Sequence, residues 1–327
     1  MARILVGLLA ALTLAAPARA DVAQAVDQVI RPAYAQLAGS AATLADAARA
    51  DCDGPGLAAP FQAVWDDWAA IDFLRLGPVE QGGRAQAISF WPDVKSSGLR
   101  AQQALIDADA PAIDDPVAFA DLSVALRGLA GLERLIYPSR LRADEGVRCR
   151  MIRATADDLA RMTAGLRDDW QTFAPELTQP GQGATPAYLT RAEAEGAIFT
   201  QIVTGLGALA DTRLGRPLGT FDKPHPDRAE AAAAGRSMAN VIASLTGMQA
   251  LTRALHDPAP RSQAGFDQAL ALARALPDDA LARVDDPQIW LKVEILQQRI
   301  QALRDTVQAE VGGALNLSVG FNARDGD

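Results

Sequence analysis

An all-α fold is the architecture that three features of this 327-residue sequence predict. Alanine is abundant and aromatic residues make up only 5% of the chain, a composition that favours helices over sheets. Clear alternating runs of valine, isoleucine and threonine, which are typical of half-buried strands, are absent. Apolar residues instead recur every three or four positions over long stretches, as they do on the buried face of a helix.

The chain is long enough for two domains, and its composition changes near the middle. Residues 174–189 are rich in proline and glycine, which is typical of a linker. We therefore expect an N-terminal helical bundle at residues 21–173 and a C-terminal one at residues 190–327, with a cleft between them.

Residues 1–20 have the pattern of a cleaved secretory signal peptide. Arg3 precedes an apolar run from Ile4 to Ala16, and Ala18-Arg19-Ala20 provides the small residues of a cleavage site. The apolar run is too short to span a bilayer. Cleavage leaves 29 basic against 40 acidic residues, a net charge of −11. We expect a periplasmic protein, free or associated with the outer membrane, that does not bind nucleic acid.

The chain contains two cysteines, Cys52 and Cys149. In an exported protein an even pair predicts a disulfide. The alternative, a pair of metal-binding thiolates, has no His or Cys nearby in the sequence to complete a metal site.

Residues that typically start and end helices define the expected helices of the N-terminal half. Asp21 caps the first helix, and the glycine and proline of Gly77-Pro78 end the second. Asp115-Pro116 should start a third helix that stops at Pro138. The expected helices of this half lie at about residues 21–49, 61–75, 115–138 and 147–173.

The C-terminal half opens with a capping box formed by Thr190 and Glu193. Asp227 is the expected cap of a long alanine-rich helix, and Asp286-Pro287 starts the last helix. Apolar residues in that last helix alternate in steps of four and three, which is the seam of an antiparallel bundle. The expected helices lie at about residues 190–213, 227–255, 266–276 and 287–307.

The two halves look like a diverged repeat. Residues 126–134 align with residues 245–253, because both segments share the spacing of Leu, Gly, Leu and Arg. Upstream, Arg75-Leu76-Gly77 aligns with Arg213-Leu214-Gly215 in the same order. If the repeat is real, each half is one small bundle, and Glu133 has the neutral Thr252 as its counterpart.

Four blocks of the sequence resemble those of the imelysin family of periplasmic proteins. Gly128 and Glu133 match the family's Gly-x-His-x-x-Glu signature, although Ala130 occupies the histidine position. The other blocks are Arg75-Leu76-Gly77-Pro78, Phe90-Trp91-Pro92-Asp93 and the C-terminal segment Gly320–Asp327. The resemblance covers most of residues 55–327, and the chain is identified as a diverged member. The family is classed among metallopeptidases and is also similar to periplasmic iron-uptake components.

The residues themselves do not predict a peptidase. A zinc hydrolase typically needs three protein ligands, often histidines, and this chain has only His225 and His256. Neither has a second His or a Glu at helical ligand spacing. The sequence also lacks a Gly-x-Ser-x-Gly nucleophile elbow. We therefore expect no catalytic residue.

What remains is a set of oxygen-bearing and guanidinium side chains, which the resemblance implies would gather in the cleft between the bundles. The expected metal ligands are Asp72, Asp93, Glu133, Asp325 and Asp327. The residues expected to bind the rest of a ligand are Arg75, Arg213 and Asn322. Carboxylate and amide oxygens suit hard cations, so the expected cofactor is iron or another hard metal ion. A structural network, in which the arginines pair with the acids, is an equally open interpretation.

The resemblance implies an exported binding protein connected with iron or other metal handling in the cell envelope. Its expected partners are an iron-uptake or outer-membrane component and a small ligand or metal in the interdomain cleft. A metallopeptidase with an altered metal site is the alternative from a different class. An envelope protein that only binds other proteins is the third.

Overall fold

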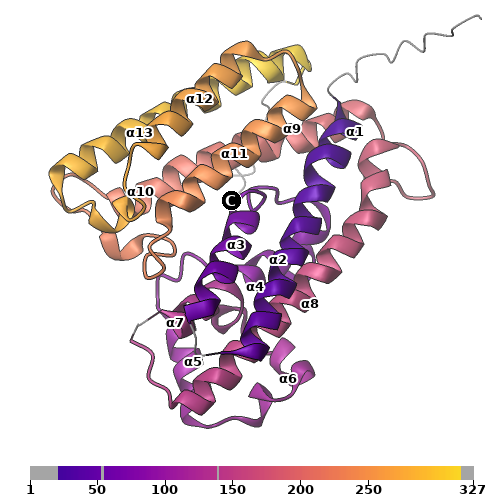
Figure 1. The fold of residues 1–327 in the computed structure, drawn as a ribbon. Helices are drawn as coiled ribbons and strands as arrows, with labels where there is room; N and C mark the ends of the chain where they lie inside the picture. The colour runs from indigo at the N-terminus through magenta and orange to yellow at the C-terminus, as the bar shows by residue number, and fades with distance from the viewer. Residues whose placement is uncertain (1–20, 53–54, 138–139, 318–327) are drawn as a thin grey trace, which may run out of the picture.

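The computed structural model describes residues 21–52, 55–137 and 140–317. In these ranges every named element is a helix, and β-structure is limited to one isolated bridge between Thr220 and Lys223. Figure 1 shows the helices in two groups. One group is tilted and has α5, α6 and α7 near its lower end, and the second group crosses its upper end. The predicted all-α fold is confirmed. The predicted signal peptide, residues 1–20, lies outside the described residues.

The N-terminal group is built on two long helices and several short ones. Its helices are α1 (Val22–Gln24), α2 (Arg31–Ala50), α3 (Ala58–Ala69), α4 (Arg84–Ile88), α5 (Ser97–Asp107), α6 (Pro116–Ala120), α7 (Gly128–Ile136) and α8 (Glu145–Thr178). A π-helical turn, Ala25–Ile30, joins α1 to α2, so the first predicted helix is continuous. Helices α2 and α8 run antiparallel and side by side (Figure 1), and Tyr34 of α2 stacks on Trp170 of α8 with ring centroids 5.2 Å apart.

The C-terminal group consists of four long helices and one short one. They are α9 (Arg191–Ala208), α10 (Gly215–Leu218), α11 (Ser237–Leu255), α12 (Pro260–Arg274) and α13 (Pro287–Val307). Helix α11 packs between α9 and α12, and α12 packs on α13. The stripe predicted for α13, from Ile289 to Val307, is buried along its whole length. The predicted cap also forms, because the Asp286 side chain accepts a hydrogen bond from the Gln288 N–H at 2.8 Å.

The two groups meet where α11 crosses the end of α3. Gly247 of α11 lies so close to α3 that a Cβ atom there would be 1.8 Å from the Ala70 carbonyl oxygen. One turn earlier, the Ser244 hydroxyl donates to the Ala69 carbonyl at 2.7 Å. Buried apolar residues of both groups form one continuous core, so the division of the chain into two domains stays a prediction.

The third predicted helix, residues 115–138, is wrong as a single element. The chain forms α6, a 3-10 turn at Val124–Leu126 and then α7. Gly128 starts α7 with φ +62°, a left-handed conformation that glycine adopts without strain. A side chain there would meet the Ala87 and Ile88 carbonyl oxygens at 2.2 and 2.3 Å. The break therefore lets α7 pack directly against the end of α4.

Other predicted boundaries also differ. Helix α3 ends at Ala69 and not near residue 75, and α12 begins at Pro260 and not near residue 266. Asp227 lies in a short 3-10 turn, Pro226–Arg228, and the alanine-rich helix α11 begins only at Ser237. The intervening residues form a turn in which Glu230 is buried, with 3% of its surface exposed. Helix α8 continues past residue 173 to Thr178, with Pro175 in its last turn, so the first residues of the predicted linker are helical.

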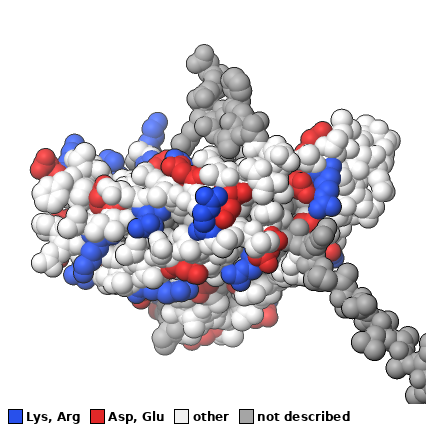
Figure 2. All heavy atoms as spheres, turned by 90° about the horizontal axis from the view of Figure 1, so that it is seen from above, with Lys and Arg blue, Asp and Glu red and all other residues white. Residues whose placement is uncertain are grey.

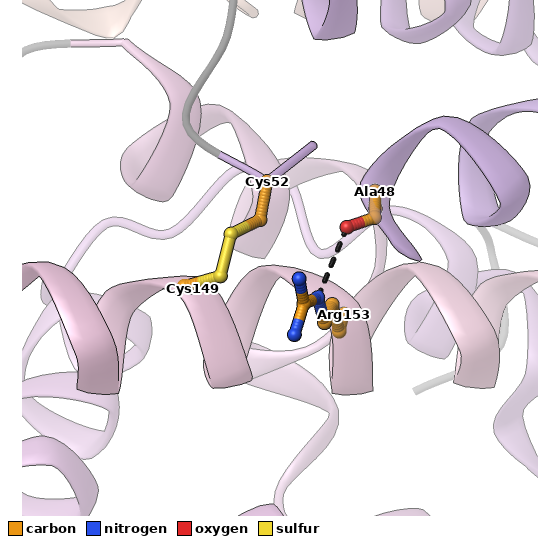
Figure 3. Close-up of a disulfide and its surroundings, with 4 residues drawn as sticks. All are labelled: Ala48, Cys52, Cys149 and Arg153. Carbon is orange, nitrogen blue, oxygen red and sulfur yellow. Dashed lines mark hydrogen bonds between the residues drawn. A yellow bond between two sulfur atoms is a disulfide. The ribbon is translucent and has the colours of Figure 1, made fainter. Parts of the chain in front are cut away.

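The predicted disulfide joins the end of α2 to the start of α8 (Figure 3). Cys52 and Cys149 are bonded, and their Cα atoms lie 5.2 Å apart. One helical turn further along α8, the Arg153 Nε–H donates to the Ala48 carbonyl at 3.1 Å. The described part of the chain holds no helix that is both long and apolar enough to cross a membrane. On the face shown in Figure 2, basic and acidic residues are interspersed among uncharged ones.

Candidate functional site

A cavity of about 320 Å³ lies between the two helical groups. Its volume is within the usual range of small-molecule sites, roughly 300–1,000 Å³. The N-terminal group lines it with Trp68, Asp72, Phe73, Arg75, Trp91 and Pro92. The C-terminal group lines it with residues that include Thr204, Thr212, Arg213, Glu230, Ser244 and Met248. Two of the sequence blocks noted above, at residues 75–78 and 90–93, therefore reach this cavity.

Irregular backbone brings the polar side chains to the cavity. On one side, α3 ends at Ala69, and the turn that follows carries Asp72 and Arg75. On the other side, α9 widens into a π-helical turn at Leu209–Leu214, from which Arg213 enters the wall. Turns of π-helix are frequent at functional sites because they reorient side chains within a helix.

Arg213 and two carboxylates form a buried cluster in the cavity wall. Its guanidinium contacts Asp72 Oδ2 at 2.5 Å and Glu230 Oε2 at 3.0 Å. Burial alone would lower the pKa of Arg213, but the two carboxylates together outweigh that effect and raise it. Arg213 also donates to the Ser244 hydroxyl at 2.6 Å. The cluster therefore keeps Arg213 charged and ties α11 to the segment after α3.

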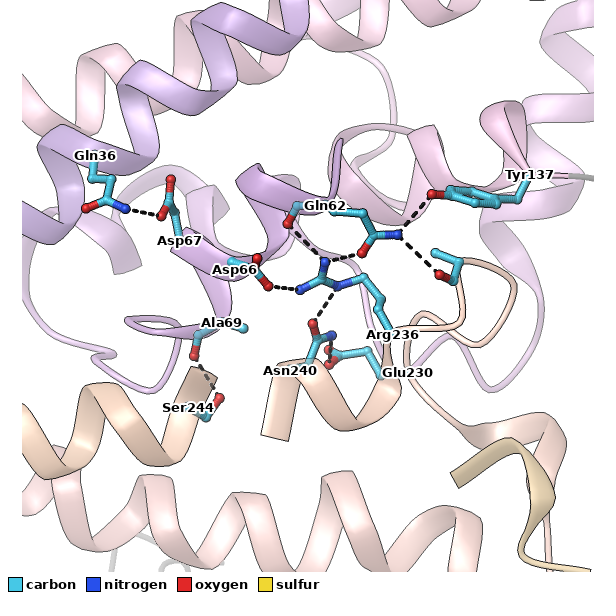
Figure 4. A network of polar contacts seen from close by, with 11 residues as sticks. Gln36, Gln62, Asp66, Asp67, Ala69, Tyr137, Glu230, Arg236, Asn240 and Ser244 are labelled. Carbon is cyan, nitrogen blue, oxygen red and sulfur yellow. Dashed lines mark hydrogen bonds and ion pairs between the residues drawn. The ribbon is translucent and has the colours of Figure 1, made fainter. Parts of the chain in front are cut away.

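Glu230 reaches this cluster from a segment, residues 229–236, that is itself held by polar contacts (Figure 4). The Asn240 amide donates to Glu230 Oε2 at 2.7 Å, and Arg236 donates to Asn240 Oδ1 at 2.8 Å. Arg236 extends to α3, where it contacts Asp66 at 2.6 Å. The segment includes Ala231 with φ +50°, a conformation that is uncommon for a residue with a side chain. Its path is thus fixed by contacts with both groups.

Glu133 anchors the same segment from the other end. Its Oε1 accepts a hydrogen bond from the Ala234 N–H at 3.1 Å, and the Ala233 N–H also contributes. Burial raises the pKa of Glu133, and the two backbone amides oppose that rise only in part. Glu133 is not among the residues that line the cavity. The carboxylate of the family-like motif therefore positions a backbone segment.

Asp93 caps a helix. Its carboxylate accepts hydrogen bonds at 2.8 Å from the Ser97 N–H, the Ser97 hydroxyl and the Gly98 N–H at the start of α5. Burial would raise the pKa of Asp93, but these hydrogen bonds outweigh it and lower the pKa. Asp93 is thus committed to the first turn of α5, although the neighbouring Trp91 and Pro92 line the cavity.

Among the predicted site residues that the structure describes, Arg75 is the most open to solvent. Its guanidinium lies 5.6 Å from the ring centroid of Trp68 and 3.9 Å from Glu80 Oε1, and 39% of its side chain is exposed. Its backbone N–H donates to Gln201 Oε1 of α9 at 2.9 Å. Arg75 is therefore held at its backbone by the C-terminal group, while its charged end reaches the cavity.

The structure brings together three of the predicted site residues, Asp72, Arg75 and Arg213. Glu133 and Asp93 make the separate contacts given above. Asn322, Asp325 and Asp327 lie outside the described residues. Within residues 21–317, gaps excepted, no three His, Cys, Asp or Glu side chains are grouped so that they could hold a metal ion.

Several residues that reach the cavity from distant segments were not predicted from the sequence. Glu230, Ser244 and Trp68 belong to the wall, and no motif marks the first two. The sequence signal for Glu230 is weak. It is an acid at the start of an alanine run, with no basic residue three or four positions away to pair with it on a helix. Trp91 and Pro92 were marked only by their block, residues 90–93.

Comparison with known proteins agrees with this architecture. Residues 30–307 match the family model described as imelysin. The protein named iron-regulated protein A of Synechococcus elongatus is 25% identical over 316 residues, which cover 88% of this chain and 83% of that protein. An imelysin-like protein from Psychrobacter arcticum 273-4 has the same fold, with a TM-score of 0.75 and 20% identity over 92% of this chain and 96% of that one. A putative iron-regulated protein A precursor from Parabacteroides distasonis superimposes with a TM-score of 0.61 and 12% identity, covering 88% of this chain and 93% of that one.

Proposed function

This chain belongs to the imelysin family, and we propose that it is an exported, non-catalytic protein that binds a small ligand during iron or other metal handling in the cell envelope. The observation that carries the proposal is the cavity of about 320 Å³ whose walls come from both helical groups. The connection with iron is supported by the name of the Synechococcus relative. Export is supported by the signal-like pattern of residues 1–20, and an envelope iron-uptake or outer-membrane component is the partner that fits this location.

The described walls of the cavity do not fit a bare metal ion. Asp72 and Glu230 are both engaged by Arg213, so their oxygens already face a positive charge. A bare cation would have to displace that arginine from a buried site, which leaves a costly unpaired charge. Arg75 adds a second guanidinium to the same walls. The proposal therefore concerns a ligand of the cavity, and no step of it depends on a metal bound by these side chains.

The absence of catalysis is proposed from the motif helix. Ala130 and Glu133 lie three residues apart on α7, where a histidine and a carboxylate would share one face. Alanine supplies no imidazole to bind a metal or carry a proton near neutral pH. Ala130→His should therefore raise the affinity for zinc, while Ala35→His, on a face of α2 with no acid three or four residues away, should not. Equal zinc affinities of the wild type and Ala130→His in a calorimetric titration would show that α7 is only a scaffold.

Occupancy of the cavity can be tested on protein purified from its native periplasm. Denatured samples are analysed by mass spectrometry for released small molecules and by elemental analysis for metals. Thr204→Trp should abolish co-purification because Thr204 is exposed on α9 and lines the cavity. Thr200→Trp is the matched control, one turn earlier on the same helix and outside the lining. Equal co-purification with both variants would refute the cavity as the site. Chelator-sensitive hydrolysis of a peptide library would favour the metallopeptidase instead.

A further inference from the structure

The two arginines of the described cavity walls differ in how their charge is used. Arg213 has carboxylate partners at 2.5 and 3.0 Å, and 10% of its side chain is exposed. Arg75 pairs with Glu80 at 3.9 Å, and the Glu80 side chain is itself 48% exposed. Such an open pair is screened by water and contributes little to stability. The guanidinium of Arg75 is therefore the group in these walls that can exchange its weak partner for a ligand.

The surroundings of Arg75 restrict which ligand that is. Its guanidinium stacks on Trp68 at 5.6 Å, an arrangement that leaves the N–H groups at the edge of the plane able to donate. The planar fork of an arginine matches the two oxygens of a carboxylate. The aromatic rings of Phe73 and Trp91 also line the cavity. They offer faces for a planar or apolar body beside the charged group.

Hydroxyl groups complete the wall on the side of the C-terminal group. Thr204 and Thr212 line the cavity along α9 and its π-helical turn. The Thr204 hydroxyl donates to the Thr200 carbonyl at 2.7 Å, so it can accept a hydrogen bond from a ligand's phenol. A threonine hydroxyl such as that of Thr212 can also donate to a carboxylate oxygen. The walls thus combine one available cation, aromatic faces and hydroxyls.

We infer that this cavity binds a small organic oxyanion, a carboxylate attached to a planar or apolar body, with the carboxylate on Arg75. The inference rests on the proposed function, because it names the ligand class of the same cavity. The oxyanion has two sources with shared chemistry: a free organic acid, or an organic acid that already chelates a metal ion. In the second case the metal arrives with its own ligands, which agrees with walls that do not fit a bare cation.

Salicylate, salicylamide and ferric salicylate are suitable probes for calorimetric titration of the mature protein. Salicylate should bind at least tenfold more tightly than the neutral salicylamide, because the amide cannot form charge-assisted hydrogen bonds with Arg75. Arg75→Gln should weaken salicylate binding tenfold or more and leave salicylamide unchanged. Arg75→Lys should recover part of the loss, since it keeps the charge without the planar fork. Arg274→Gln, at an exposed position on α12, should bind as the wild type does.

The outcomes separate the ligand class from the proposed function. If salicylamide binds as tightly as salicylate and Arg75→Gln changes neither, the oxyanion inference is overturned while the cavity remains a ligand site. If none of the probes binds at millimolar concentration, the oxyanion inference fails, and co-purification with Thr204→Trp and Thr200→Trp decides separately whether the cavity is a ligand site. Tighter binding of ferric salicylate than of salicylate would identify the chelated source, and the reverse order the free acid.

Discussion

Replacing Gly247 by alanine tests whether its contact with α3 holds the two helical groups together. The new Cβ would lie 1.8 Å from the Ala70 carbonyl oxygen and 2.8 Å from its carbon, so α11 and the end of α3 must move apart. Inside a helix, alanine is favoured over glycine by about 1 kcal/mol. Overpacking typically costs about 1–3 kcal/mol, and a clash with backbone belongs at the upper end. The expected net loss of unfolding free energy is therefore about 2 kcal/mol.

The assay is urea unfolding followed by circular dichroism, with Gly165→Ala as the matched control. Gly165 lies inside α8, and a Cβ there would meet nothing within 4 Å. The control should therefore gain about 0.5–1 kcal/mol from helix propensity alone. If Gly247→Ala is as stable as this control, the close contact is not a constraint on the fold, and the reasoning is refuted.

Three further predictions concern covalent, electrostatic and pH effects. The Cys52–Cys149 bond closes a loop of 97 residues, so in the chain-entropy model its loss costs about 4.7 kcal/mol; free thiols in unreduced protein by mass spectrometry, or an unchanged melting temperature after reduction, would contradict it. Asp72→Asn leaves Arg213 with fewer charged partners in a buried site and should cost about 3 kcal/mol in urea unfolding; a loss below about 0.5 kcal/mol, the scale of an ordinary surface change, would refute that role. Burial raises the pKa of Glu133 above its unfolded value, so its favourable contribution is present at low pH and is lost as pH rises through the folded pKa. Glu133→Gln keeps an acceptor and should lose less stability between pH 4 and pH 8 than the wild type, whereas identical pH slopes would speak against a buried carboxylate.

Helices with a strong local signal were predictable. The apolar period of α13 and its Asp286 cap are encoded within one segment, and both appear as expected. The break before α7 was not predictable in the same way, because the space for a side chain at Gly128 is closed by the carbonyl oxygens of Ala87 and Ile88, about forty residues earlier. The delayed start of α11 has a similar cause. Helix propensity favours the alanine run before it, but burial of Glu230 against Arg213 overrides that preference.

Part of the candidate site was predictable from the sequence, although the four blocks were a mixed guide, because Asp93 and Glu133 belong to blocks and do not line the cavity. Asp72 and Arg75 follow the end of α3, Arg213 lies in the π-helical turn after α9, and all three belong to the cavity wall. Glu230 and Ser244 were missed because their importance lies in pairing with a residue from another element. Spacing along one chain segment carries no information about such partners.

The replacement of the motif histidine and the contacts of Glu133 bear on one another physically. A carboxylate binds a metal through the same oxygen lone pairs that here accept the backbone amides of Ala234 and Ala233. The raised pKa of Glu133 means that a proton also competes with a metal for its carboxylate. Ala130 offers no second metal ligand on that face of α7. Glu133 instead fixes the segment that carries Glu230 to Arg213. The carboxylate of Glu230 then helps to balance the positive charge of Arg213 in the buried wall. Recognition of a charged ligand then falls to Arg75, the cavity cation whose partner is weak enough to be exchanged.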